Sequence, residues 1–158
     1  WRTVDEGETW TQIDGRAGGD KTGFVLRSGN FDLARGPHGL LRIVNPGLLR
    51  VEAYTADGKR KFMWGKAEST VEGFSGCCNP SHIALRPDGS FVTSEKGLVR
   101  VKIYKASGEF SGVVAPPAKF DEKIEGQAPD VAVDEDGNIY ALDFDRNVLR
   151  VFEPKISE

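Results

Sequence analysis

The sequence has no long apolar run, no excess of positive charge and almost no cysteine, and each shortage excludes a class of protein. Its apolar runs are only a few residues long, far below the roughly 20 residues that a membrane-spanning helix needs. The 21 basic and 24 acidic side chains give a net charge of −3, so neither a nucleic acid nor an anionic membrane is an expected partner. Two cysteines among 158 residues exclude a disulfide-rich scaffold.

Catalytic motifs and helical periodicity are also missing. The chain contains no nucleophile elbow, phosphate-binding loop, paired-carboxylate pattern or zinc-protease pattern. No segment sustains an apolar period of 3.6 residues, so we expect almost no helix, apart from a short helical turn within 118–126.

The N-terminus bears on the compartment. The chain begins with Trp1, and its single methionine is Met63, which predicts an end made by processing, by proteolysis or by the choice of the expressed segment. Together with the adjacent cysteines, this favours an exported protein, periplasmic or extracellular. A truncated cytoplasmic protein would look the same.

What the sequence does contain is an internal repeat of about 50 residues. Three similar segments begin at Asp32, His82 and Asp130, and each carries an apolar residue followed by alanine and then a turn glycine. The glycines recur at intervals of 50 and 48 residues. A Leu/Val-Arg-Val triplet recurs at intervals of 50, in copies at 49–51, 99–101 and 149–151.

Within each repeat, the turns and the alternation of side chains predict antiparallel strands. The turns GPHG, RPDG and DEDG end in glycine, which accepts the positive φ of tight hairpins. The stretches LRVEAY and VRVKIY alternate apolar and polar residues, as a half-buried strand does. Four short strands per repeat are typical of propeller blades.

This pattern resembles the NHL-repeat family of six-bladed β-propellers over residues 30–158, although its period is longer than that of a compact NHL repeat. The resemblance implies an all-β fold: a β-propeller segment of about three four-stranded antiparallel blades, half of a six-bladed ring. The expected divisions are the end of a preceding blade with a connecting loop (1–29), one blade (30–78), a second blade (79–127) and a last blade lacking its outer strand (128–158).

Half a ring would leave apolar blade faces in water, so the resemblance implies a partner. One possibility is the rest of a longer propeller chain. The other is a second copy that completes the ring, in which the stretch TWTQI at 9–13 supplies the missing outer strand of its partner's last blade. Another protein subunit is also a possible partner.

The only two cysteines are adjacent, in the stretch Cys77-Cys78-Asn79-Pro80, with His82 close behind. We expect this stretch to join two blades near the channel mouth, where propellers bind their ligands. A vicinal disulfide that stiffens the turn, two inert thiols that fill a corner, and metal or redox chemistry all remain open. Cys77, Cys78, Asn79 and His82 are therefore candidate binding or redox residues.

Asp32, His82 and Asp130 occupy the same place in the three repeats and are candidate ligands for a divalent metal, calcium or zinc. The alternative is that polar residues simply begin strands near water. Lyases that resemble NHL proteins hold a metal with channel histidines, but this chain has only one histidine besides His82, namely His38 in the GPHG turn. A single copy thus has too few histidines for a three-histidine zinc site.

Arg50, Arg100 and Arg150 lie in the three recurring triplets. We expect each to cover apolar surface and to pair with a carboxylate of a neighbouring blade. A ring of arginines that binds an anion is the alternative.

These features favour a non-catalytic module that binds a ligand or protein, or takes part in assembly, at the loop-rich channel face. The alternatives are a lactonase- or lyase-like enzyme with a metal in the channel, and a redox accessory that uses the vicinal cysteines. No cofactor is firmly implied, and an enzyme is the less favoured of these functions.

Overall fold

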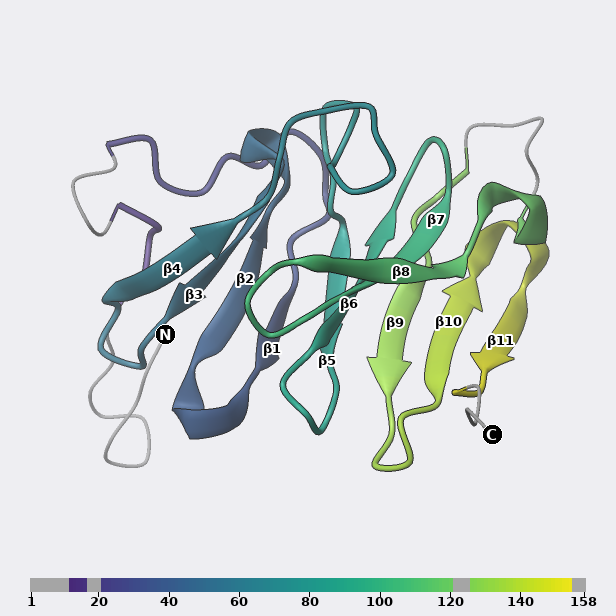
Figure 1. Ribbon diagram of the computed structural model, residues 1–158. Helices are drawn as coiled ribbons and strands as arrows, with labels where there is room; N and C mark the ends of the chain where they lie inside the picture. Colours follow the sequence, from purple (N-terminus) through teal and green to yellow (C-terminus); the bar gives the residue numbers. More distant parts are fainter. Residues whose placement is uncertain (1–11, 17–20, 121–125, 155–158) are drawn as a thin grey trace.

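The computed structural model describes residues 12–16, 21–120 and 126–154, and these residues form three antiparallel sheets (Figure 1). The first sheet contains β1 (Leu33–Arg35), β2 (Leu41–Asn45), β3 (Arg50–Tyr54) and β4 (Arg60–Trp64). The second contains β5 (His82–Leu85), β6 (Phe91–Glu95), β7 (Arg100–Tyr104) and β8 (Phe110–Ala115). The third contains β9 (Asp130–Val133), β10 (Ile139–Asp143) and β11 (Val148–Phe152).

Helical structure in the described residues is limited to single 3-10 turns. These turns are η2 (Pro37–Gly39), η3 (Pro46–Leu48), η4 (Pro117–Lys119) and η5 (Phe144–Arg146). η4 overlaps the start of the segment 118–126 for which a helical turn is predicted, and residues 121–125 of that segment lie outside the described part. None of the helices in the described residues is long and apolar enough to cross a membrane.

The hairpins close at the predicted glycines. Gly89 and Gly137 have φ values of 81° and 84°, in the left-handed region that suits glycine. Their amides donate to the carbonyl oxygens of Arg86 and Asp134, three residues earlier. Two short strands and one tight turn therefore fold locally within each repeat.

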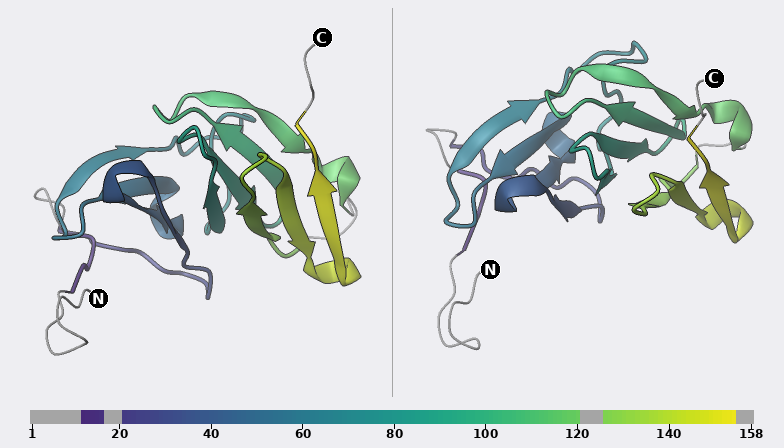
Figure 2. Two further views of the ribbon diagram at one scale, coloured as in Figure 1. Left: turned by 90° about the horizontal axis from the view of Figure 1, so that it is seen from below. Right: turned by 60° about the horizontal axis from the view of Figure 1, so that its bottom comes forward.

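The three sheets are arranged as blades around a common side. Their first strands β1, β5 and β9 are neighbours, while the later strands of each sheet fan outward (Figures 1 and 2). The predicted all-β fold is confirmed, with propeller-like blades of four, four and three strands in the described residues. We refer to the three sheets as blades 1, 2 and 3.

The hydrophobic core lies between the blades. Buried apolar side chains of blades 1 and 2 form one cluster, made of Val44, Val51, Phe74, Ile83, Phe91 and Tyr104. Those of blades 2 and 3 form another, made of Ala84, Val92, Val99, Val101, Ala115, Phe120, Val131, Ile139 and Ala141. Each blade is thus stabilised mainly by burying apolar area against its neighbour.

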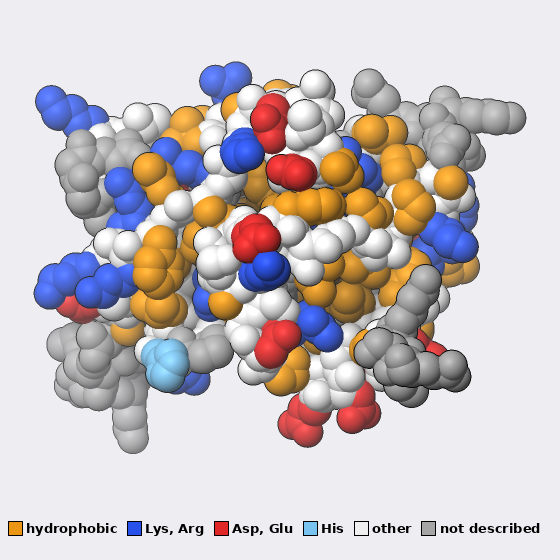
Figure 3. Space-filling model, in the orientation of Figure 1, with side chains coloured by type: hydrophobic (Ala, Val, Ile, Leu, Met, Phe, Trp, Pro, Cys, Tyr) orange, Lys and Arg blue, Asp and Glu red, His pale blue; other side chains and the backbone are white. Residues whose placement is uncertain are grey.

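Apolar surface remains exposed beyond these interfaces. On blade 3, Leu142, Leu149 and Val151 are each at least 50% exposed, and they share the face opposite the core because Leu142 pairs with Leu149. Apolar side chains also gather where β8 crosses in front of the third sheet (Figure 3). A hollow lies there between the two blades, lined in part by Val113, Val114 and Phe152.

The strand register corrects the repeat derived from the arginine triplets. In blade 2, Glu95 pairs with Arg100, and in blade 3, Asp143 pairs with Val148. Blades 2 and 3 are therefore related by 48 residues throughout, so that Arg150 corresponds to Lys102 rather than to Arg100. The 50-residue spacing of the third triplet is a coincidence of sequence.

The predicted strand at 9–13 lies largely outside the described residues. Its two described residues, Gln12 and Ile13, are not part of a strand. Residues 12–16 and 21–31 instead run along the outer side of blade 1, where Phe24 contacts the ring of Tyr54 at 5.7 Å between centroids.

Candidate functional site

The first strands of the three blades bring Asp32, His82 and Asp130 together. Asp32 precedes β1 directly, whereas His82 and Asp130 are the first residues of β5 and β9. Because these strands lie side by side, one ligand atom from each residue lies within 4.8 Å of the others. Equivalent positions of a repeated fold thus converge on one point, which we call the axial cluster.

Hydrogen bonds fix the two carboxylates of the axial cluster. The Oδ1 atom of Asp32 accepts from the Leu33 amide at 2.7 Å, and its Oδ2 atom accepts from the Ile83 amide at 2.9 Å. This second bond links blade 1 to blade 2. Asp130 Oδ1 accepts from the Val131 amide at 2.8 Å.

The imidazole of His82 lies between the carboxylates without a direct hydrogen bond to either. Its Nδ1 atom is 3.6 Å from Asp32 Oδ2 and 3.6 Å from Asp130 Oδ1, longer than a normal N–H···O bond. All three residues are at least partly exposed, so the cluster is open to solvent and to a ligand.

The axial cluster holds negative charge. Partial burial by itself raises the pKa of the Asp32 carboxyl, but the neighbouring imidazole of His82 and the amides of Ile83 and Leu33 outweigh it and lower that pKa. Asp32 is therefore a carboxylate at neutral pH and is suited to bind a cation.

A hollow of about 350 Å³ adjoins the axial cluster. It combines amide and charged side chains with exposed apolar ones, and it is lined by Asn30, His82, Gln127, Ala128, Asp130, Leu142 and Phe144. Phe144, at the start of η5, is 72% exposed. A few polar groups beside an apolar wall are typical of a ligand site.

The cysteine pair lies in the connection between β4 and β5. Cys77 is exposed and Cys78 is buried, and the two free thiols approach each other to 3.1 Å between sulfur atoms. The turn is held by Asn79, whose Nδ2 atom donates to the carbonyl oxygens of Ser75 and Lys96 and whose Oδ1 atom accepts from the Lys96 amide. The Asn79–Pro80 peptide bond is cis.

The two thiols differ in acidity. The pKa of Cys77 is raised, first by its hydrogen bond to Cys78 and then by the charge of that neighbour. Burial raises the pKa of Cys78, but the hydrogen bond from Cys77 and the charge of Lys96 outweigh it and lower that pKa. Cys78 is thus the first of the pair to ionise, although Cys77 is the more exposed of the two.

A second hollow surrounds the cysteines. It is lined by Gly76, Cys77, Cys78, Asn79, Lys96, Gly97, Gly126 and Gln127. Gln127 lines both this hollow and the one beside the axial cluster. The two hollows are therefore adjacent, and we call them together the loop face, because loops between strands build most of it (Figure 1).

The structure separates the predicted site residues into two groups. Cys77, Cys78 and Asn79 line one hollow, whereas His82 lines the other. His38 lies in η2, outside the axial cluster. Gln127 and Phe144 were not predicted, since neither belongs to a recurring motif of the sequence.

The arginines of the repeat are structural, and the ion pairs seen for them among the described residues lie within single blades rather than between neighbouring blades as predicted. Arg100 donates to Glu95 at 2.7 Å and Arg50 to Glu52 at 2.6 Å, each within its own blade. Arg150 likewise pairs with Asp143 of its own blade at 2.7 Å. In blades 2 and 3 the ion pair joins the hydrogen-bonded second and third strands, and in blade 1 both residues lie on β3.

Comparison with known proteins supports the fold. No protein family and no curated protein matches the chain. Among solved structures, it is similar to virginiamycin B lyase from Staphylococcus aureus, a propeller, with a TM-score of 0.54 and 14% identity. That match covers 84% of this chain and 45% of the lyase.

A second solved structure is similar to the chain. It is hydrazine synthase from Kuenenia stuttgartiensis, with a TM-score of 0.49, 14% identity, and coverage of 95% of this chain and 39% of that one. The chain spans less than half the length of either protein. At 14% identity, the similarity to the lyase establishes a propeller-like fold and no activity.

Proposed function

We propose that this chain is a non-catalytic binding module of the NHL-like propeller type, and that the loop face is its binding surface. The observation that supports the proposal best is the junction of the two hollows at Gln127. Together they offer a ligand two thiols, amides, the carboxylate of Asp130 and the exposed apolar side chain of Phe144.

The lining of the loop face favours binding over catalysis. Among the described residues, the hollow beside the axial cluster has no serine, threonine, tyrosine, cysteine or lysine in its wall. The wall thus offers His82 no hydroxyl, thiol or amine nucleophile, and its one acid is Asp130, whose carboxylate lies 3.6 Å from the imidazole. The alternative, a lactonase- or lyase-like enzyme, depends on a metal at the axial cluster.

Titration of the 15N-labelled protein with a panel of small carboxylic acids, sugars and dipeptides tests the binding module. We expect amide shifts at residues 76–79, 96–97 and 126–130. The variant Gln127→Trp, which places an indole ring where the two hollows meet, should strongly reduce these shifts. Its matched control is Glu135→Trp, in the separate hollow lined by Arg35 and Arg86. The proposal is contradicted if none of the probes shifts these amides, or if the shifts are unchanged in Gln127→Trp.

Within this proposal, Cys77 and Cys78 form a vicinal disulfide in an oxidising compartment and stiffen the wall of their hollow. Cys77, which is exposed, loses its proton, attacks a disulfide-class oxidant such as oxidised glutathione and releases one glutathione thiolate. The Cys78 thiolate then attacks the Cys77 sulfur of the mixed disulfide, which closes the bridge and releases the second glutathione. Oxidised protein should be 2 Da lighter and should take up no iodoacetamide when denatured; two alkylated cysteines would exclude the bridge.

Assembly is the second part of the proposal. The exposed face of blade 3 presents Leu142, Leu149 and Val151, where a closed propeller has its next blade. We expect another blade to cover it, from a longer chain or from a second copy. Sedimentation velocity should show a dimer that Leu149→Glu converts to monomer if the second copy is the source. A stable wild-type monomer favours a longer chain as the source of the covering blade. A wild-type dimer that Leu149→Glu leaves unchanged contradicts a role of this face in assembly.

A further inference from the structure

We infer that Asp32, His82 and Asp130 form a binding site for a divalent transition-metal ion, with zinc as the best fit. The inference goes beyond the proposed binding module, because the site would exist whether or not a ligand occupies the loop face. It rests on the spacing of the three side chains, their donor atoms and the way their strands hold them.

The spacing suits a metal better than it suits hydrogen bonds. Two ligand atoms at zinc bond lengths of about 2.0–2.1 Å lie about 3.3 Å apart at tetrahedral angles. His82 Nδ1 lies 3.6 Å from one oxygen of Asp32 and 3.6 Å from one of Asp130. These two separations exceed a hydrogen bond and lie a few tenths of an ångström above the zinc value, and the third, between the two carboxylates, is within 4.8 Å.

The donor atoms select the kind of metal. One imidazole nitrogen with two carboxylate oxygens is a set that zinc binds, and three protein ligands leave a fourth position open. Calcium takes six to eight oxygen ligands, more than this cluster supplies. The hollow beside the cluster, with Asn30 and Gln127 in its wall, is where a water or ligand atom would occupy the open position.

The scaffold holds the ligands in place before a metal arrives. Asp32 accepts two backbone amides, one from each of two blades, and Asp130 accepts one. The first residues of β5 and β9 supply His82 and Asp130. Ligands on strands and fixed by backbone donors lose little freedom on binding, which is what a designed site requires.

One other arrangement explains the same geometry. A protonated His82 between two carboxylates forms an ion triad that needs no metal. The two explanations differ in a measurable way, since the triad predicts no stoichiometric uptake of metal and the metal site predicts one ion per chain.

Zinc titration by calorimetry, with zinc content measured after dialysis, decides between them. The experiment uses the Cys77→Ser, Cys78→Ser double variant as background, so that thiols take up no zinc. We expect one zinc per chain, and cobalt to give visible absorption bands of a four-coordinate site. In that background, His82→Ala should weaken zinc binding at least 100-fold, whereas His38→Ala should leave it unchanged.

Asp130→Asn is the second variant, because its side chain is 61% exposed and its loss should leave the fold intact. Circular dichroism of the metal-free variants confirms that they are folded. The inference is overturned if the background protein binds no zinc at 1 mM, or if folded His82→Ala or Asp130→Asn binds zinc as tightly as the background does. Loss of zinc binding without any change in the shifts caused by loop-face probes would separate this site from the proposed function.

Discussion

Blades 1 and 2 place buried groups of opposite charge at the same position. The centre of the third strand is Glu52 in blade 1 and Lys102 in blade 2, and both side chains are fully buried. The residue that ends the second strand is Asn45 in blade 1 and Glu95 in blade 2. The buried acid is thus on the third strand in blade 1 and on the second strand in blade 2.

In blade 1 the acid is surrounded by donors. Glu52 accepts from Asn45 at 2.8 Å, from Arg50 at 2.6 Å and from the hydroxyl of Tyr54. Asn45 in turn binds the incoming segment, since its Nδ2 atom donates to the Gly23 carbonyl and its Oδ1 atom accepts from the Val25 amide.

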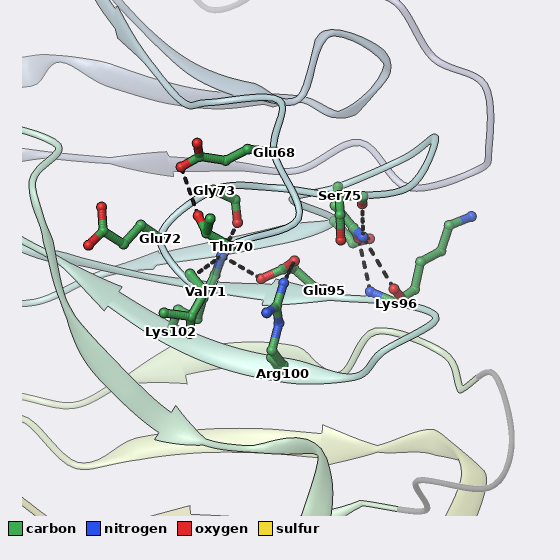
Figure 4. A network of polar contacts seen from close by, with 12 residues as sticks. Glu68, Thr70, Val71, Glu72, Gly73, Ser75, Glu95, Lys96, Arg100 and Lys102 are labelled. Atoms are coloured by element: carbon green, nitrogen blue, oxygen red, sulfur yellow. Dashed lines mark hydrogen bonds and ion pairs between the residues drawn. The ribbon is translucent and has the colours of Figure 1, made fainter.

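In blade 2 the buried cation Lys102 takes the place of the acid and binds the backbone of the incoming segment (Figure 4). Lys102 Nζ lies 2.6 Å from Glu95 Oε1 and donates to the carbonyls of Gly73 and Val71 at 2.6 and 3.2 Å. It also lies 4.4 Å from the ring centre of Phe74. Burial lowers the pKa of Lys102, and the attraction of Glu95 offsets this only in part.

The comparison shows what the position requires. Both blades bind the backbone of the segment that enters them, at residues 15, 23 and 25 for blade 1 and at residues 71 and 73 for blade 2. Binding this backbone takes a pair of buried polar side chains, one on the second strand and one on the third. The side chain on the third strand can be an acid or a base if the second strand supplies a side chain that pairs with it. Blade 3 follows blade 2, with Arg150 paired to Asp143 and its guanidinium 5.4 Å from the ring centre of Phe120.

Removing the cation of blade 2 should have the largest effect. Lys102→Met leaves two carbonyls and part of Glu95 buried without their donor, so we expect the free energy of unfolding to fall by about 3–5 kcal/mol. Urea unfolding measures it. Lys105→Met is the control, because the Lys105–Glu109 pair is exposed and should change stability by less than about 0.5 kcal/mol. A loss below 1 kcal/mol for Lys102→Met would show that the contacts of Lys102 with Glu95 and the two carbonyls do not stabilise blade 2.

Transplanting the pattern of blade 1 into blade 2 should restore part of that stability. Lys102→Glu alone places a second carboxylate beside Glu95, whereas Glu95→Asn with Lys102→Glu recreates the amide–carboxylate pair of Asn45 and Glu52. We expect a favourable coupling of about 2 kcal/mol in a double-mutant cycle, because Arg100 then pairs with the new acid as Arg50 does. Additive losses would mean that the two centres are not interchangeable.

The tyrosines at the end of the third strand should show a smaller difference of the same origin. The hydroxyl of Tyr54 donates to the Glu52 carboxylate, and that of Tyr104 to the Glu72 carbonyl at 3.0 Å. Hydrogen bonds to charged groups are stronger, so Tyr54→Phe should cost about 2 kcal/mol and Tyr104→Phe about 1 kcal/mol. Chemical denaturation of both variants measures which one loses more free energy of unfolding. Equal losses would show that the carboxylate of Glu52 does not strengthen the hydrogen bond of Tyr54.

The same tyrosines should make the fold sensitive to alkali. Burial, and then the nearby acid, raises the pKa of both Tyr54 and Tyr104 above the ordinary value of 10. A group whose folded pKa is raised stabilises the fold fully below its unfolded pKa and loses that contribution as the pH rises. From pH 9.5 to 10.5, stability should fall by roughly 0.7 kcal/mol for each tyrosine.

The matching phenylalanine variants provide the control for the alkaline effect. Each should lose less stability than the wild-type protein over this pH range, because one tyrosine no longer titrates. The absorbance at 295 nm should show Tyr54 and Tyr104 ionising only as the protein unfolds. Ionisation of all three tyrosines near pH 10 in the folded protein would contradict the argument.

Much of the fold could be predicted, and part of the candidate site. Asp32, His82 and Asp130, at the start of the first strand of each repeat, were candidate ligands because they share one place in the repeat, and the structure does bring them together. The repeat could not show that Gln127 joins the two hollows, since that depends on how the loops of neighbouring blades pack together. The recurring triplets also aligned Arg150 with Arg100, whereas the strand register aligns it with Lys102, two residues further on.

The sequence by itself determined the strands, the turns and the number of blades. These depend on short-range rules: side chains alternate along a strand, and glycine takes the backbone angles that a tight turn needs. Only the tertiary structure decided which charges meet in each blade and which loops line the loop face. Those contacts join residues far apart in the chain, and their geometry depends on strand register and on the packing of one blade against the next.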